Sequence, residues 1–230
     1  MKKNYLAAAI LTGLSLSAVT LPAMAYEAGD WLVRGRVINV NPNDDSGRLY
    51  VGGTSIGEGV TVDDDTVPEL DITYMLNRNW GVELILGFSE HTVRTHKSAG
   101  SIVGSLGSKD VIDTKVLPPT LTLQYHFMPD SNIRPYVGAG INYTYFFDEK
   151  VPSKSGVAAA GDSVELDSSW GLAAQAGVDI AINQDWFVNL DVKYIDIDTK
   201  AKFKRTAVDS AEINADIDPF VWGVGIGRRF

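Results

Sequence analysis

Eight segments of the chain alternate between large apolar residues and small or polar ones. In the last of them, residues 220–230, every second position from Phe220 to Ile226 is bulky and apolar, whereas Gly223, Gly225 and Gly227 stand between them. A period of two is the period of a β-strand. A strand that is bulky on one face and nearly bare on the other is typical of a closed barrel, whose outer face meets lipid and whose inner face meets a crowded lumen.

The same period predicts seven further strands. They cover residues 31–41, 67–75, 80–89, 120–127, 134–147, 170–181 and 186–194. The connections alternate in length: 76–79, 128–133 and 182–185 are short, and 42–66, 92–118, 148–168 and 200–218 are long and polar. Short turns at one end and long loops at the other are the pattern of an outer-membrane barrel. We therefore predict an all-β fold, an eight-stranded antiparallel transmembrane β-barrel with short periplasmic turns and long extracellular loops.

Tryptophans support this orientation. Trp31, Trp80 and Trp186 each open a strand at a predicted periplasmic end, and Trp170 lies at the opposite edge. Indole rings favour the membrane interface, where one end of the ring is wet and the other lies in hydrocarbon. The alternative is that these residues are core aromatics of a soluble β-sandwich, but such a protein would have to cover eight apolar strand faces.

The N-terminus predicts export. Lys2 and Lys3 precede an apolar run, and Ala23-Met24-Ala25 follows it. This order is typical of a secretory signal peptide. The alternative, a membrane anchor, is disfavoured because the run is shorter than the roughly 20 residues of a spanning helix and contains several hydroxyl residues. We expect cleavage after Ala25, so that residues 1–25 are the signal peptide and residues 26–230 form a single barrel domain.

Composition excludes several classes of protein. The chain has no cysteine, which excludes a disulfide framework and a lipid-anchored precursor. Loss of Lys2 and Lys3 reduces the basic residues from 20 to 18 against 29 acidic ones, and changes the formal charge from −9 to −11. Nucleic acid is not an expected partner, since binding it needs a basic face.

Several segments resemble the OmpW family of Gram-negative outer-membrane proteins. They are Leu117–Leu121 (LPPTL), Arg134–Tyr143 (RPYVGAGINY), Ser169–Gly171 (SWG), Asp185-Trp186 and Tyr194–Asp198 (YIDID). The resemblance implies a barrel in the outer membrane with a narrow, partly apolar lumen, and a role in passing small hydrophobic molecules. It implies no enzyme activity and no cofactor. The expected partners are outer-membrane lipid and small hydrophobic molecules, and we expect a monomer.

The chain ends on an aromatic residue, Phe230, on the outward parity of the last strand. Outer-membrane barrels commonly end in this way, and we expect the barrel-assembly machinery to recognise Phe230. Arg228 departs from the pattern, because it occupies an outward position where an aromatic or aliphatic residue is usual.

The inward parity predicts a charged layer in the lumen. Its members come from several strands and carry both signs of charge; they are Arg34, Asp71, Glu83, Asp179, Lys193 and Arg229. An eight-stranded barrel has room only for side chains or one small ligand, so these charges have partners across the lumen. One interpretation is a purely structural salt-bridged plug, and the other is a constriction that blocks ions and water.

Nearer the loops the inward residues become apolar or small. We expect them to line a pocket that opens to the outside; they are Ile38, Val40, Ile85, Tyr136, Gly138 and Gly140. Inward glycine leaves room for a ligand, but it also eases tight barrel curvature.

Prolines cluster at the outer ends of strands, with Pro118 and Pro119 as the strongest case. Proline has no N–H to donate to a ladder. We therefore predict a lateral opening at Pro118 and Pro119, through which an apolar molecule leaves the pocket into the membrane. The alternative is that the prolines only end their strands.

Catalytic and metal chemistry is not expected. His91, His96 and His126 lack the spacing of metal ligands, and a histidine in a polar loop is usually exposed to solvent. The glycine runs lie within strands and are not followed by helices, which argues against a nucleotide site. Acidic loop residues are expected to hydrate the rim, since they lack the spacing of a calcium loop.

Two functions remain open at this stage. The first is a passive conduit for small hydrophobic molecules, which the apolar inward residues predict. The second is a closed structural or adhesive barrel whose extracellular loops bind phage, bacteriocin or a host surface, which the charged lumen predicts.

Overall fold

The computed structural model describes residues 25–43, 48–51, 54–55, 60–95, 110–153, 163–204 and 211–230. The predicted signal peptide lies outside these residues, except for Ala25. No helix in the described part of the chain is long and apolar enough to span a membrane.

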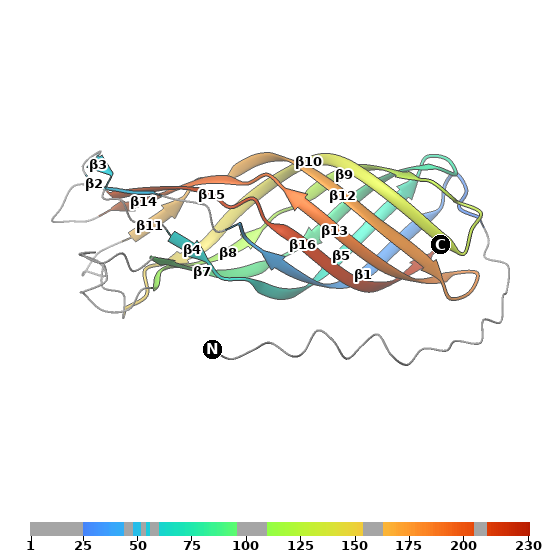
Figure 1. Ribbon diagram of the computed structural model, residues 1–230, viewed down its shortest axis with the longest axis horizontal. Helices are drawn as coiled ribbons and strands as arrows, with labels where there is room; N and C mark the ends of the chain where they lie inside the picture. The colour runs from blue at the N-terminus through green and yellow to red at the C-terminus, as the bar shows by residue number, and fades with distance from the viewer. Residues whose placement is uncertain are drawn as a thin grey trace.

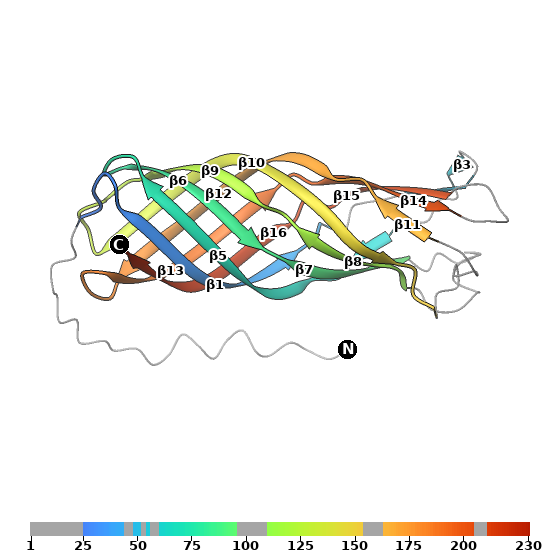
Figure 2. The same ribbon diagram turned by 180° about the vertical axis from the view of Figure 1, so that it is seen from behind.

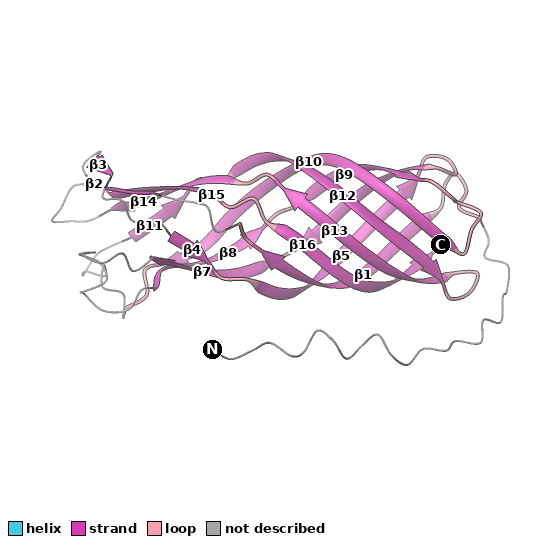
Figure 3. Cartoon of the chain, viewed as in Figure 1, coloured by secondary structure: helices cyan, strands magenta, loops and turns pink. Residues whose placement is uncertain are grey.

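Eight strands close into a barrel (Figures 1 and 3). They are β1 (Trp31–Asn41), β5 (Asp65–Met75), β6 (Trp80–Gly87), β9 (Thr120–His126), β10 (Ile133–Lys150), β12 (Ser169–Ala181), β13 (Trp186–Ile195) and β16 (Phe220–Arg229). Neighbours in space follow the chain, β16 pairs with β1, and every pair is antiparallel. The predicted eight-stranded antiparallel barrel is confirmed.

Alternation of side chains fixes the two faces of the wall. In β16 the outward Trp222 is 59% exposed, whereas Gly223 and Val221 are buried against the lumen. The outer face carries large exposed apolar side chains on all eight strands, among them Leu121 and Leu172. An apolar surface of this extent requires an apolar surrounding, and the pairing of each strand with both of its neighbours satisfies most of the backbone polar groups within it.

Two asparagine side chains stabilise two of the short connections. The Asn77 side-chain oxygen accepts hydrogen bonds from the backbone N–H groups of Asn79 and Trp80, and Asn183 does the same for Asp185 and Trp186. Asparagine stabilises turns in this way because its side chain imitates the backbone. We call this the short-turn end of the barrel, and the C-terminus lies there (Figure 2).

The opposite, long-loop end differs from the prediction. The segments expected to be loops contain strands; they are β2 (Arg48–Val51), β3 (Thr54–Ser55), β4 (Val60–Val62), β7 (Ser89–Thr95), β8 (Asp110–Leu117), β11 (Ser163–Leu166), β14 (Asp198–Lys204) and β15 (Ala211–Asp216). The reason for the error is their polar outer face. In β14, lysines at 200, 202 and 204 alternate with buried Thr199, Ala201 and Phe203.

The extension forms two separate sheets (Figure 1). One contains β10, β8, β7 and β4, and the other contains β11, β14, β15, β2 and β3. The interior is layered along the barrel axis. An apolar cluster of Tyr26, Leu32, Met75 and Phe187 closes the short-turn end. A polar layer follows, then an apolar cluster that includes Ile38, Val116, Phe146 and Val221. At the top, Val93 and Ile112 of one sheet meet Val164, Ala201 and Phe203 of the other.

Candidate functional site

The polar layer of the lumen is built around Arg34. Its guanidinium donates to both carboxylate oxygens of Asp179, at 3.2 and 2.8 Å, to Glu83 Oε1 at 3.1 Å and to Thr73 Oγ1 at 2.6 Å. All four side chains are completely buried. Fork-shaped pairing of this kind satisfies the donors of a buried arginine, which would otherwise be strongly destabilising.

A second arginine, Arg36, lies one inward position higher on β1. Four carboxylates surround it: Asp71 at 2.5 Å, Glu69 and Asp191 at 3.1 Å, and Glu83 at 3.8 Å. Glu83 therefore joins the two arginines. The network links β1 to β5, β6 and β13, and it ties strands that are not neighbours in the ladder.

Lys193 closes the layer on the loop side. Its ammonium contacts Glu69 Oε1 and lies 3.8 Å from Asp191. Lys193 is 3% exposed, so this pair is excluded from solvent. The structure thus places Arg34, Asp71, Glu83, Asp179 and Lys193 in one continuous set of contacts.

Arg229 is not part of this set, and its prediction as a plug residue is wrong. Its guanidinium donates to the backbone oxygen of Ala25 at 2.7 Å and lies 3.6 Å from Asp30, at the rim of the short-turn end. The inward parity was read correctly. The position is too close to the end of the strand to reach the network.

Tyr136 belongs to the polar layer, so its prediction as a pocket residue is wrong. Its hydroxyl donates to Asp191 at 2.7 Å and accepts from Asn189 at 3.0 Å. Its ring lies 5.4 Å from the Arg34 guanidinium carbon. The phenol thus extends the network and covers one face of the arginine.

Sequence reasoning missed Tyr26, which seals the layer from below. It is fully buried; its hydroxyl donates to Asp179 at 2.9 Å, and its ring lies edge-on to His126 and beneath Arg134. The only available signal was an isolated aromatic residue just before the first strand. Nothing in the period of the strands could say that this residue folds back into the lumen.

Above the polar layer lies an apolar cavity of about 80 Å³. The structure places Ile38, Val40 and Ile85 on its wall, together with Val116 and Phe146. Glu69 reaches the floor, where Lys193 pairs with it. The cavity is capped by the apolar cluster that joins the two extension sheets.

Gly138 and Gly140 do not line this cavity, and their prediction as pocket residues is wrong. A Cβ atom on Gly138 would meet the side chain of Gln175 at 2.8 Å, and one on Gly140 would collide with the backbone of Leu121 and Thr122. These glycines allow neighbouring strands and side chains to approach closely and leave no room for a ligand.

The wall of the cavity has a break in its ladder. β6 pairs with β9 as far as Ile85↔Thr120, and β7 pairs with β8 from Ser89↔Val116 in the same register. The three pairs between these rungs, which include Pro118 and Pro119, form no described ladder bond. Gly87, Phe88 and Pro118 line the cavity here.

The histidine expected in an exposed loop, His91, is buried on β7 beside the cavity. Its ring nitrogens lie 2.8 Å from Ser89 Oγ and 2.8 Å from the backbone oxygen of Asp63. Because a carbonyl can only accept, Nδ1 donates to the backbone oxygen of Asp63. Both nitrogens therefore have partners. His96 lies outside the described residues.

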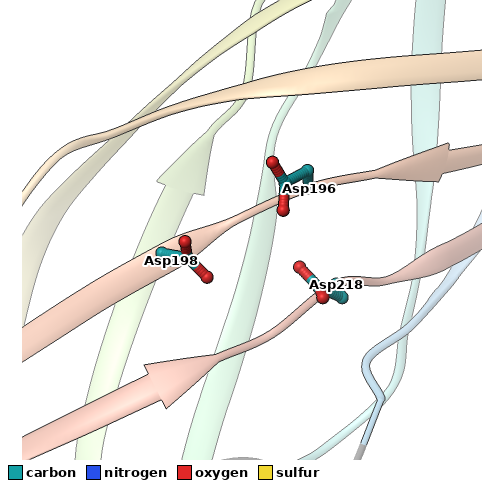
Figure 4. Close-up of side chains that lie close together, drawn as sticks. All are labelled: Asp196, Asp198 and Asp218. Carbon is teal, nitrogen blue, oxygen red and sulfur yellow. The ribbon is translucent and has the colours of Figure 1, made fainter.

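A cluster of three aspartates lies on the outer face of the wall. Asp196, Asp198 and Asp218 lie side by side (Figure 4), and one carboxylate oxygen of each lies within 4.8 Å of those of the other two. Two of them flank Ile197, whose side chain points into the cavity, so the carboxylates lie outside it. Partial desolvation, and then the charges of Asp216, Asp196 and Asp218, raise the pKa of Asp198. Asp218 already accepts hydrogen bonds from Ile197 N and Tyr194 Oη.

Comparison with known proteins gives a consistent result. Residues 27–230 match the OmpW family. Outer membrane protein W of Vibrio cholerae is 37% identical over 233 residues and covers 100% of both chains. The crystal structure of OprG from Pseudomonas aeruginosa is similar with a TM-score of 0.81 and 38% identity, and covers 90% of this chain and 99% of OprG. A Pseudomonas protein named for a dibenzothiophene metabolism operon, DoxH, is 29% identical over 94% of this chain and 95% of its own length.

Proposed function

Because the chain belongs to the OmpW family of outer-membrane proteins, we propose that it is a passive conduit for small apolar molecules. The relatives are outer-membrane proteins of Gram-negative bacteria, and we place the short-turn end of the barrel toward the periplasm. The proposed path begins outside, passes through the apolar cavity and ends in the hydrocarbon of the membrane. It does not continue to the periplasm.

One observation carries this proposal: the apolar cavity rests on a layer of ionised side chains and meets the ladder break at Pro118 and Pro119. Entry of an apolar molecule into the polar layer is unfavourable, because displacing Arg34 or Arg36 from their carboxylates would leave buried charges unpaired. The outer face of the break is apolar, with Phe88 and Leu117 exposed toward lipid. Sideways release is therefore the route of lower free energy.

The name of one relative agrees with this substrate class. DoxH is named after the metabolism of dibenzothiophene, a flat, uncharged and apolar ring system. Molecules of this kind partition poorly into the charged surface of an outer membrane, so a conduit past that surface is useful to the cell.

The second candidate, a closed structural or adhesive barrel, is favoured by a different observation. Val93 and Phe203 belong to the apolar cluster that joins the two extension sheets above the cavity. If that cluster never separates, the cavity is only a packing space and the extracellular surface carries the function.

A charged substitution in the cavity wall tests the proposal that the barrel is a conduit. We expect Ile85→Asp to reduce the rate of transfer of pyrene into vesicles with a lipopolysaccharide outer leaflet by tenfold or more, because a carboxylate on the wall removes the apolar path. Ile85→Val, which keeps the wall apolar, should transfer pyrene at close to the parental rate. Equal rates for the parent, Ile85→Asp and protein-free vesicles would favour the closed barrel.

Restoring backbone donors tests the lateral release. The double substitution Pro118→Ala, Pro119→Ala supplies two N–H groups, and we expect the ladder between β6 and β9 to continue into β7 and β8. Release into lipid should then slow several-fold while the cavity still binds the probe. Unchanged transfer in a correctly folded double variant would argue that the prolines only end strands. The readout is pyrene excimer fluorescence in the acceptor bilayer.

A further inference from the structure

The hairpin that joins β10 to β12 is split at the long-loop end of the barrel (Figure 2). β10 and β12 pair in one register from Ile133↔Ile180 to Thr144↔Ser169. Beyond that rung the upper half of β10 pairs with β8, and β11 pairs with β14. Among the described residues no ladder bond joins β10 to β11. The split is one of the seams between the two extension sheets.

The cause of the split is one extra residue. β12 pairs with β13 with Ala173 opposite Ile195, whereas β11 pairs with β14 with Leu166 opposite Ala201, which is one residue out of step. The extra residue falls within Asp167–Ser168 and forms a β-bulge.

The bulge reverses the faces of β11 relative to β10. Leu166 and Ser169 both face inward although they are three residues apart. If β11 continued the β10–β12 register, inward Leu166 would stand opposite Phe147, which has the outward parity of Tyr145. A ladder requires paired residues to share a face, so the two strands separate. The sequence therefore builds the split into the wall.

Apolar groups line both sides of the split. On the inner side, Phe146 of β10 and Leu166 of β11 both belong to the cavity wall. On the outer side, the rings of Tyr145 and Phe147 stack with centroids 6.1 Å apart and planes 10° apart. Trp170, just below the split, is 72% exposed.

The height of the split suits the chemistry of the membrane surface. The rings of Tyr143 and Trp170 lie 4.7 Å apart. These two residues form the pair just before the final pair, Thr144↔Ser169, of the β10–β12 ladder. Aromatic rings of this kind lie at the interface between hydrocarbon and headgroups. Unpaired backbone groups are tolerated there because water and headgroups can bond them, whereas in hydrocarbon they are not.

We propose that the split between β10 and β11 is the way into the cavity for a flat or single-chain apolar molecule at the outer surface of the membrane. The proposal rests on the conduit function above and adds to it. Access and release use different openings: molecules pass between Phe146 and Leu166 to enter, and leave at Pro118 and Pro119.

Deletion of Ser168 tests the proposal directly. The shorter chain keeps the pairs between β11 and β14, places Phe146 opposite Leu166 with both side chains inward, and lets the ladder close. The readout is a short pulse of the apolar photolabel 3-trifluoromethyl-3-phenyldiazirine, added outside lipopolysaccharide-coated vesicles. Labelling is compared at Ile85, which faces the cavity, and at Leu84, which faces lipid.

We expect the deletion to reduce labelling of Ile85 at least fivefold and to leave Leu84 unchanged. The Pro118→Ala, Pro119→Ala variant should label Ile85 like the parent and lose only transfer. Parental labelling of Ile85 in the folded deletion variant would overturn the split as the way in. Absence of Ile85 labelling in the parent itself would instead contradict the conduit.

A second variant is needed in case the deletion prevents folding. The chain has no cysteine, so Phe147→Cys and Phe88→Cys can each carry one bulky maleimide. The label at position 147 covers the split, and the matched label at position 88 covers the proline break. We expect only the first to slow labelling of Ile85, and only the second to slow release. An unchanged labelling rate with position 147 modified would also refute the proposal.

Discussion

Arg34→Ala should lower the free energy of unfolding by about 3–5 kcal/mol, the effect of removing one partner from a buried ion pair. The arginine is completely buried and donates to Asp179, Glu83 and Thr73. Without it, two carboxylates remain in the lumen with fewer partners and no solvent. The measurement is urea unfolding of the barrel in phospholipid vesicles, followed by tryptophan fluorescence.

Arg228→Ala is the matched control for this effect. Arg228 lies on the outer face of β16 at the short-turn end and is exposed, with its guanidinium carbon 4.7 Å from the Phe230 ring centroid. Loss of an exposed arginine changes stability by about 0.5 kcal/mol or less in most proteins. If the two variants unfold at the same urea concentration, the polar layer contributes little to stability.

Gly140→Ala should be strongly destabilising, although it adds only one methyl group to the wall. The added carbon would lie 2.7 Å from the Cα of Thr122 and still closer to the backbone oxygen of Leu121. Backbone atoms of a paired strand cannot move aside as a flexible side chain can. We expect a loss of about 1–3 kcal/mol, the usual range for overpacking, or failure to form the heat-resistant barrel on gels.

Gly35→Ala provides the comparison within the same barrel. Gly35 lies on the outer face of β1, and a Cβ atom there would meet nothing within 4 Å. Alanine restricts the unfolded chain more than glycine does, so this variant should be neutral or more stable by up to about 1 kcal/mol. A similar loss at both positions would mean that strand propensity, and not close approach, explains the glycines.

The sequence predicted the wall of the barrel better than its contents. Strict alternation identified the eight strands and assigned the inward face of Arg34, Asp179 and Lys193. It could not predict how far along the barrel axis each inward side chain lies. Tyr136 and Gly140 share the inward face with Ile38, but the structure places them level with the polar layer and its neighbours, below the cavity. The extracellular strands were missed because their outer faces are as polar as loops.

Parity along each strand and the position of the short turns were therefore determined by the sequence alone, since a period of two needs no partner to be read. Which residues meet inside was decided only by the tertiary structure. Arg34 and Asp179 lie 145 residues apart in sequence and are joined by two hydrogen bonds. Strand tilt and register bring them to the same level. The extra residue within Asp167–Ser168 is a second example. Its effect appears only when β11 and β12 are aligned with the neighbouring strands, because a bulge is a difference in length between paired strands.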